Sequence, residues 1–116
     1  FDKGLDAFNN KRFYEAHEFW EDIWVEYRLP DSKFIQGLIQ LTVGFYHITN
    51  QNLNGARSLF RKSKKKFDLY DGTHRRLSMR IIKRIVNESL DCVENINSVE
   101  EFDWSVCNRL EKQIDQ

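Results

Sequence analysis

The spacing of apolar residues is the feature that most constrains the fold of this chain. Between turn signals, apolar side chains recur three and four positions apart, which places them on one face of an α-helix. No stretch shows the strict alternation of apolar and polar residues that is typical of a half-buried strand. One Pro and five Gly among 116 residues also argue against a turn-rich sandwich or barrel. The sequence therefore predicts an all-α protein, a single compact bundle of five or six helices over residues 1–116.

Turn signals divide the chain into segments of helical length. Four predicted helices span residues 2–8, 12–28, 32–49 and 53–70, and Pro30 ends the second of them. We expect a fifth helix to begin after Thr73, as its N-cap, and to continue past Val93. The capping box Ser98-x-x-Glu101 predicts a sixth helix. Its apolar stripe would hold Val99, Phe102, Val106, Leu110 and Ile114, whereas Trp104 falls off that stripe.

The cysteines indicate a compartment for this protein, and the longest uncharged run indicates whether it spans a membrane. Cys92 and Cys107 fit neither a CxxC pair nor a disulfide framework, so we expect reduced thiols in an intracellular compartment. The uncharged run over residues 34–51 is interrupted by Gln, His and Asn side chains. It therefore predicts a buried core helix and no membrane span.

The second predicted helix carries the most informative polar residues. At 100° per residue, His17 projects from the middle of the apolar face, among Phe13, Trp20 and Trp24. Glu21 lies one turn further along, within reach of His17 at i+4. The other acidic residues of this helix turn progressively toward solvent: Glu18, Asp22, Glu15 and Glu26.

The third predicted helix carries a second polar stripe. Gln36, Gln40, His47 and Gln51 fall within about 60° of one another. Gly37 and Gly44 border this stripe at heptad spacing and would let a neighbouring helix approach closely. If the second and third helices pack antiparallel through the Pro30 turn, His17 and Glu21 face Gln36, Gln40 or His47.

Two interpretations of these polar residues stay open. In the first, His17 and Glu21 form a buried hydrogen-bonded pair that fixes the register of the bundle. In the second, they hold a divalent metal or a small polar ligand, since residues at i and i+4 can converge on one ion. The metal ligands would be His17, Glu21 and His47. The candidate pocket comprises Glu15, His17, Glu18, Trp20, Glu21, Trp24, Gln36, Gln40 and His47.

The residues also resemble a known family. The matching segments are Glu15-Ala16-His17-Glu18-x-Trp20-Glu21-x-x-Trp24, then Phe34-x-Gln36-Gly37-Leu38-Ile39-Gln40-Leu41, a later His47, and Gly55-Ala56-x-x-Leu59. Together they resemble the uncharacterised helical proteins catalogued as domain of unknown function 309, found in bacteria, archaea and plastids. The resemblance covers roughly residues 8–67. It implies a compact all-α bundle with the first motif helix packed on the second, and a cytoplasmic or plastid stromal location. It implies no activity, and residues 70–116 match no pattern.

The net charge of zero hides an uneven distribution. Residues 1–56 carry a net charge of −3, residues 57–84 carry +9 and residues 85–116 carry −6. The basic segment 57–84 is the electrostatic footprint expected for a phosphate-rich partner. The phosphate-binding candidates are Arg61, Lys64, Lys65, Arg76, Arg80 and Arg84. Alternatively, this basic face is neutralised by the acidic final segment, within the chain or in a dimer mate.

We therefore favour a non-catalytic binding or structural module with a buried His/Glu/Gln network, and no cofactor is identified. A homo-oligomer would use the aromatic surface near Phe19 and Val25, and we expect no membrane partner. One alternative is a metal-dependent enzyme that uses His17, Glu18, Glu21 and His47. The other is a nucleic-acid accessory protein that uses residues 57–84.

Overall fold

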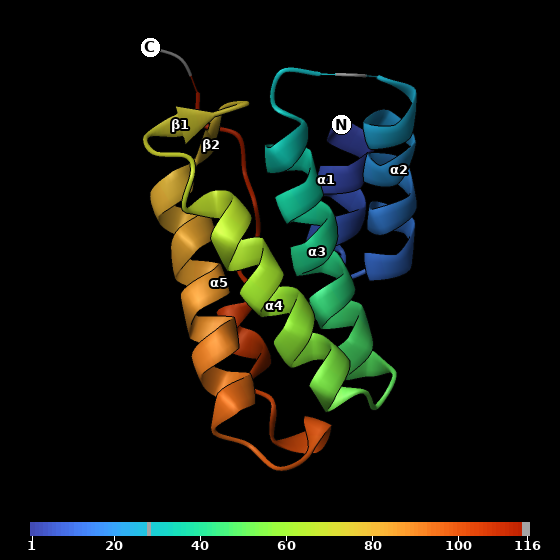
Figure 1. Cartoon of the computed structure of the whole chain (residues 1–116), viewed down its shortest axis with the longest axis vertical. Helices are drawn as coiled ribbons and strands as arrows, with labels where there is room; N and C mark the ends of the chain where they lie inside the picture. The colour runs from blue at the N-terminus through green and yellow to red at the C-terminus, as the bar shows by residue number, and fades with distance from the viewer. Residues whose placement is uncertain (28, 115–116) are drawn as a thin grey trace.

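Each α-helix of this protein packs against the helix that follows it in the chain (Figure 1). The computed structural model describes residues 1–27 and 29–114. Its α-helices are α1 (Asp2–Asn9), α2 (Phe13–Glu26), α3 (Ser32–Thr49), α4 (Leu53–Phe67) and α5 (Met79–Glu94). The predicted all-α bundle is confirmed. Among the described residues, no helix combines the length and the apolar character needed to cross a bilayer.

The first four predicted helices are confirmed, with shifts at some ends. α3 spans the predicted residues 32–49, and α1 ends one residue later than predicted. α2 ends at Glu26, and residue 28, the predicted end, lies outside the described residues. α4 ends at Phe67, three residues before Tyr70. The Asn52 side chain caps α4 by accepting a hydrogen bond from the Gly55 N–H at 2.9 Å.

The predicted start of the fifth helix is wrong because a small hairpin precedes α5. Strands β1 (Thr73–His74) and β2 (Leu77–Ser78) pair antiparallel, so Thr73 faces Ser78. The two turn residues, Arg75 and Arg76, have φ values of 47° and 64°. Such a turn usually contains Asn-Gly, and the Arg-Arg pair gave no hairpin signal. Ser78, not Thr73, caps α5, and its Oγ accepts a hydrogen bond from the Ile81 N–H at 3.4 Å.

The predicted sixth helix is also wrong. The Glu101 carboxylate does accept a hydrogen bond from the Ser98 N–H at 3.0 Å, but this contact caps one 3₁₀ turn, η1 (Val99–Glu101). A second 3₁₀ turn, η2 (Trp104–Val106), follows it. The remainder, residues 107–114, is the C-terminal segment, which is not helical and runs back along the bundle toward the hairpin (Figure 1).

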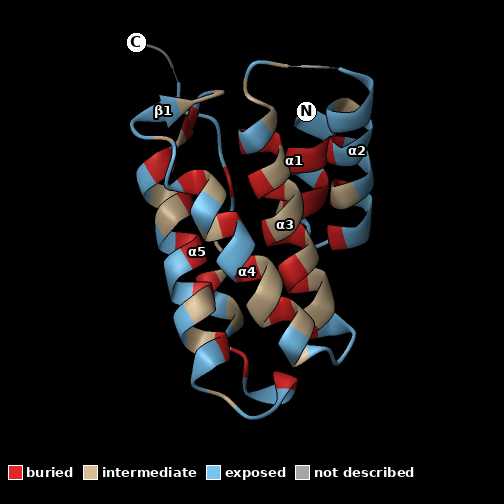
Figure 2. Cartoon of the chain, in the orientation of Figure 1, coloured by how far each residue is buried: buried red, intermediate tan, exposed pale blue. Residues whose placement is uncertain are grey.

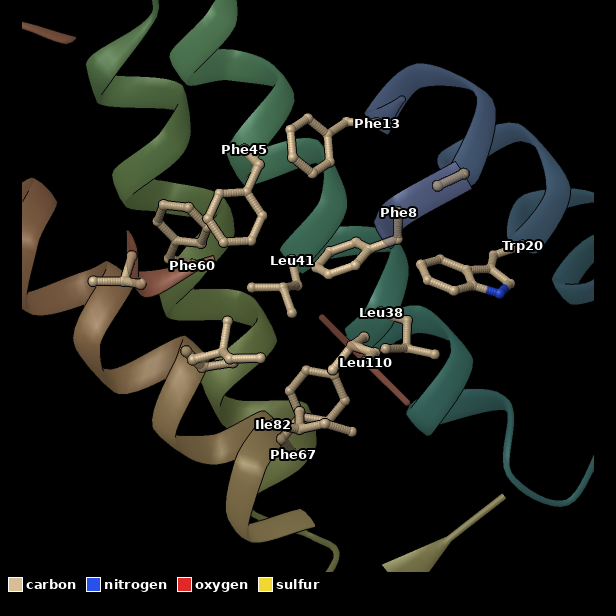
Figure 3. Packing of buried hydrophobic residues seen from close by; sticks show 14 of the residues in the cluster. Phe8, Phe13, Trp20, Leu38, Leu41, Phe45, Phe60, Phe67, Ile82 and Leu110 are labelled. Carbon is tan, nitrogen blue, oxygen red and sulfur yellow. The ribbon is translucent and has the colours of Figure 1, made fainter. Parts of the chain in front are cut away.

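Leu110 anchors the C-terminal segment in the core. Its side chain is 2% exposed and lies among residues of the helices (Figure 3). The Asn9 side chain binds both backbone groups of Leu110, donating to its carbonyl at 2.9 Å and accepting from its N–H at 2.7 Å. Four of the five residues of the predicted apolar stripe, Val99, Phe102, Val106 and Leu110, are therefore buried without a continuous helix, whereas Ile114 is exposed.

The core is a continuous cluster of apolar side chains with aromatic rings at its centre (Figures 2 and 3). The Phe45 ring lies 5.3 Å from Phe13 and 5.1 Å from Phe60, measured between centroids. Trp104, which falls off the predicted stripe, packs against both Phe13 and Phe45 at 5.9 Å. One cluster of rings therefore connects α2, α3 and α4 with Trp104 of the C-terminal region.

The predicted close approach at Gly37 and Gly44 is confirmed, and the neighbouring helix is α4. A Cβ atom at Gly44 would lie 2.6 Å from the Phe60 ring, and one at Gly37 would lie 3.0 Å from the Phe67 ring. The two glycines and the two phenylalanines are each seven residues apart, so they pair in antiparallel order. Glycine at these positions lets the rings lie against the α3 backbone.

Candidate functional site

α2 lies at the edge of the bundle, where its main contacts are α1 and α3 (Figure 1). Phe13, Ala16 and Trp20 are buried in these contacts. The prediction that Trp24 shares this buried face is wrong, because Trp24 is 41% exposed, and Tyr27, directly after the helix, is 56% exposed. A helix with neighbours on one side buries a narrow stripe, and the predicted stripe was wider than the actual contact.

The predicted pair between His17 and Glu21 forms. His17 Nε2 contacts the Glu21 carboxylate, but the two side chains are 25% and 48% exposed. The expectation of a buried pair is therefore corrected to a pair at the surface. The tyrosine ring of Tyr14 packs beside it, 5.8 Å from the His17 ring and 5.6 Å from the Tyr46 ring of α3. Tyr14 is not among the residues predicted for the site, although it lies three positions before His17 on the same helix.

The polar stripe of α3 does not join this pair. Gln36 and Gln40 are half-buried, and within the described residues neither hydrogen-bonds to His17 or Glu21. The Gln40 Oε1 atom is buried without a hydrogen-bond partner. His47 lies in the last turn of α3, where its Nδ1 is 3.3 Å from the amide nitrogen of Asn52, the residue that caps α4.

A metal site is not assembled from the predicted ligands. In the described part of the chain, no three His, Cys, Asp or Glu side chains cluster closely enough to hold an ion. His47 is occupied at the turn, and Glu18 is exposed on α2. The predicted ligands therefore do not converge among the described residues, and the solvent side of α2 is an open surface.

That surface combines exposed aromatic and acidic side chains. Of the seven large apolar side chains exposed among the described residues, five lie on α2 or directly after it. Residues 13–27 contain five carboxylates and no Lys or Arg. We call this surface the acidic–aromatic face; its exposed residues are Tyr14, Glu15, Glu18, Phe19, Glu21, Asp22, Trp24, Val25, Glu26 and Tyr27.

Shallow hollows border this face. Trp24 and Tyr27 line one of about 340 Å³ together with Leu29 and Ser32. Phe19 and Glu15 line another of about 400 Å³ toward α1.

The residues of the acidic–aromatic face lie within a segment that matches a known protein family. The model of the family described as a domain of unknown function, DUF309, matches residues 1–59. The chain belongs to this family. The DUF309 match begins before and ends before the predicted span 8–67, and it includes α1, α2, α3 and the first part of α4. The hairpin, α5 and the C-terminal segment lie outside the DUF309 match. Among curated proteins, none matches the chain.

A charged cluster that was not predicted from the sequence lies partly outside the DUF309 match. The Asp31 carboxylate accepts hydrogen bonds from Arg75 Nε at 2.5 Å and Nη2 at 3.0 Å, and His74 Nε2 lies 2.9 Å away. The Arg75 guanidinium, and after it His74, lower the pKa of Asp31 to about 2 against the desolvation of the carboxyl. The partners are more than 40 positions apart, so no local spacing could indicate this cluster.

The phosphate-binding candidates divide into two groups. Arg61 pairs with Glu94, Lys64 with Asp68, and Arg76 donates to the Gln113 carbonyl. Lys65, Arg80 and Arg84 have no partner among the described residues. Residues 85–116 were predicted as one source of carboxylates that neutralise the basic residues 57–84. Among the described ion pairs, Arg61–Glu94 is the one that joins these two segments.

Proposed function

We propose that this protein is a non-catalytic binding module. Its acidic–aromatic face would dock a protein segment that presents apolar and basic side chains together. The observation that carries this proposal is the concentration of exposed aromatic side chains on one helix. Trp and Tyr contribute more than other residue types to the centres of protein interfaces, because they bury a large area with few rotatable bonds.

The charge of this face favours a basic partner. Five carboxylates with no Lys or Arg in residues 13–27 would repel the same face of a second copy. A symmetric dimer through Phe19 and Val25 is therefore a weaker alternative. The His17–Glu21 pair holds one of these carboxylates beside Tyr14, and so contributes to the shape of the face.

The metal-dependent enzyme alternative has less support. It requires His17, Glu21 and His47 to share one ion, whereas His47 lies against Asn52 at the α3–α4 turn. The acidic–aromatic face offers carboxylates and rings at the surface, an arrangement suited to docking.

Binding of designed peptides tests the proposal. Three labelled amphipathic helical peptides would share one apolar face and carry Lys, Gln or Glu at all polar positions. We expect the Lys peptide to bind in fluorescence anisotropy measurements. Replacing Trp24 by Ala should weaken this binding about tenfold or more, the loss typical of a central interface aromatic.

One variant serves as the control for binding, and a second variant measures how much the His17–Glu21 pair contributes to stability. Leu69→Ala removes a side chain that is 60% exposed but lies outside the acidic–aromatic face, and it should leave binding unchanged. His17→Ala should lower the free energy of unfolding by about 1 kcal/mol or less, because a half-exposed ion pair contributes little. Equal binding of the Lys and Glu peptides, or full binding by Trp24→Ala, would refute the proposal.

A further inference from the structure

Basic side chains gather at the end of the molecule that holds the hairpin, on the side of α4 and α5 rather than on the side of α2 (Figure 1). The last turns of α4, the hairpin and the first turns of α5 lie at this end (Figure 1). Residues 62–84, which form these elements, contain nine Lys and Arg and two Asp. We call this region the basic end.

Some of these cations are held by carboxylates, and others have no partner. Lys64 pairs with Asp68 at 3.4 Å and Lys83 with Asp71 at 2.8 Å, while Arg75 binds Asp31. In the part of the chain that the structure describes, five cations have no ion pair, hydrogen bond or ring contact. They are Lys62, Lys65, Lys66, Arg80 and Arg84.

The order of charges along α5 opposes its own helix dipole. Its first two turns hold Arg80, Lys83 and Arg84, and its second half holds Glu88, Asp91 and Glu94. A helix is stabilised by the reverse order, with acidic residues first and basic residues last. Folding of α5 therefore gives no reason for cations at this end. An anionic partner would turn the unfavourable arrangement into a favourable one.

The unpartnered arginines also border a hollow. Arg80 and Arg84 lie one turn apart on α5 and line a space of about 540 Å³ with Lys83 and Asn87. Asp71 and Glu88 lie at the same hollow, and Asp71 is held by Lys83. Each of these guanidinium groups presents paired N–H donors that can bind two phosphate oxygens at once.

We infer that the basic end binds the sugar–phosphate backbone of a double-stranded nucleic acid. Among the described residues of the basic end, no aromatic side chain is free to stack on bases, since Phe67 is buried and the Tyr70 ring packs against His74. Within the described residues, Leu69 is the one exposed large apolar side chain of this end, so a lipid surface would gain little apolar contact. Contact with phosphates alone explains the residues present.

A salt series tests this inference on the whole chain. Fluorescence anisotropy would measure the binding of labelled 20-base-pair DNA and RNA duplexes between 25 and 200 mM NaCl. We expect binding that weakens steeply with salt, because each neutralised phosphate releases counterions. The slope of log K against log[salt] is negative, and Arg80→Gln/Arg84→Gln should reduce its magnitude by about two. The same variant should weaken binding about tenfold. The ratio of DNA to RNA affinity identifies which duplex is preferred.

A variant with the same charge change elsewhere provides the control. Arg12 and Arg109 are exposed and lie outside the basic end, so Arg12→Gln/Arg109→Gln removes two charges from other surface ion pairs. Its salt slope should equal that of the unmodified protein. Absence of duplex binding at 25 mM NaCl, or equal losses in the two variants, would overturn the inference. Tighter binding to vesicles of 30% phosphatidylserine in phosphatidylcholine than to either duplex would overturn it in favour of a lipid surface.

Discussion

Asp31 joins two parts of the chain that are distant in sequence. It follows α2 and receives hydrogen bonds from Arg75 of the hairpin turn, while His74 of β1 lies beside it. The Arg75 guanidinium also lies 4.8 Å from the centre of the Phe1 ring. These contacts restrain a turn whose two arginines have positive φ values, which is an unfavourable conformation for arginine.

Replacing Asp31 by Asn should lower the free energy of unfolding at pH 7 by about 1.5–3 kcal/mol, the range for hydrogen bonds to a charged group. Asp31 has a pKa of about 2 in the folded protein against 3.8 when unperturbed. Its carboxylate therefore stabilises the fold above about pH 4, and this contribution disappears as the pH falls toward 2. Urea denaturation at pH 7, 4 and 2 should show the difference between the two proteins shrinking. A constant difference at all three pH values would contradict this account.

Among the elements, α3 and α4 form the closest pair. Gly37 and Gly44 face Phe67 and Phe60 across this contact, so each ring occupies the space that a side chain would fill. Four residues at matching heptad spacing therefore fix the antiparallel register of the two helices.

Gly44→Ala should destabilise the protein by about 1–3 kcal/mol, because its Cβ would lie 2.6 Å from the Phe60 ring. The higher helix propensity of Ala offsets part of this loss. Gly37→Ala should cost less, since its nearest contact is at 3.0 Å. Thermal unfolding of the two variants measures the order. A smaller loss in Gly44→Ala combined with Phe60→Leu than the sum of the two single losses would show the coupling.

Local spacing was sufficient for the first four helices and insufficient for the C-terminal region. Pro30 and the i, i+3, i+4 pattern placed α1 to α4, and i+4 spacing placed His17 against Glu21. The apolar spacing through Val106 and Leu110 predicted a sixth helix wrongly, because 3₁₀ turns joined by extended chain can bury residues at the same spacing. Two features could not be predicted from local spacing: the exposure of Trp24 and the hydrogen bonds of Asp31. Both depend on which helices and strands pack against each other in the folded chain.

At the scale of the whole molecule, the C-terminal segment packs on a core built by the five helices. Leu110→Ala should lower the free energy of unfolding by about 2–4 kcal/mol, as a large-to-small change in a buried site.

Asn9→Ala should lower the free energy of unfolding by about 1–2 kcal/mol, because it leaves the Leu110 backbone groups without their partners. Ile114→Ala, in an 86% exposed side chain of the same segment, should change stability by about 0.5 kcal/mol or less. Chemical denaturation compares the three, and equal effects would contradict the anchoring role of Leu110.

The hydrogen bonds of Asn9 to Leu110 also bear on the kinetics of folding. Helices that pack on their neighbours in sequence close short loops and associate rapidly, whereas Asn9 and Leu110 are separated by 101 positions. We expect the helices to assemble before this longest loop closes. Interactions made after the transition state act mainly on the rate of unfolding. The C-terminal segment would then govern how long a folded molecule persists, and have little influence on how quickly it forms.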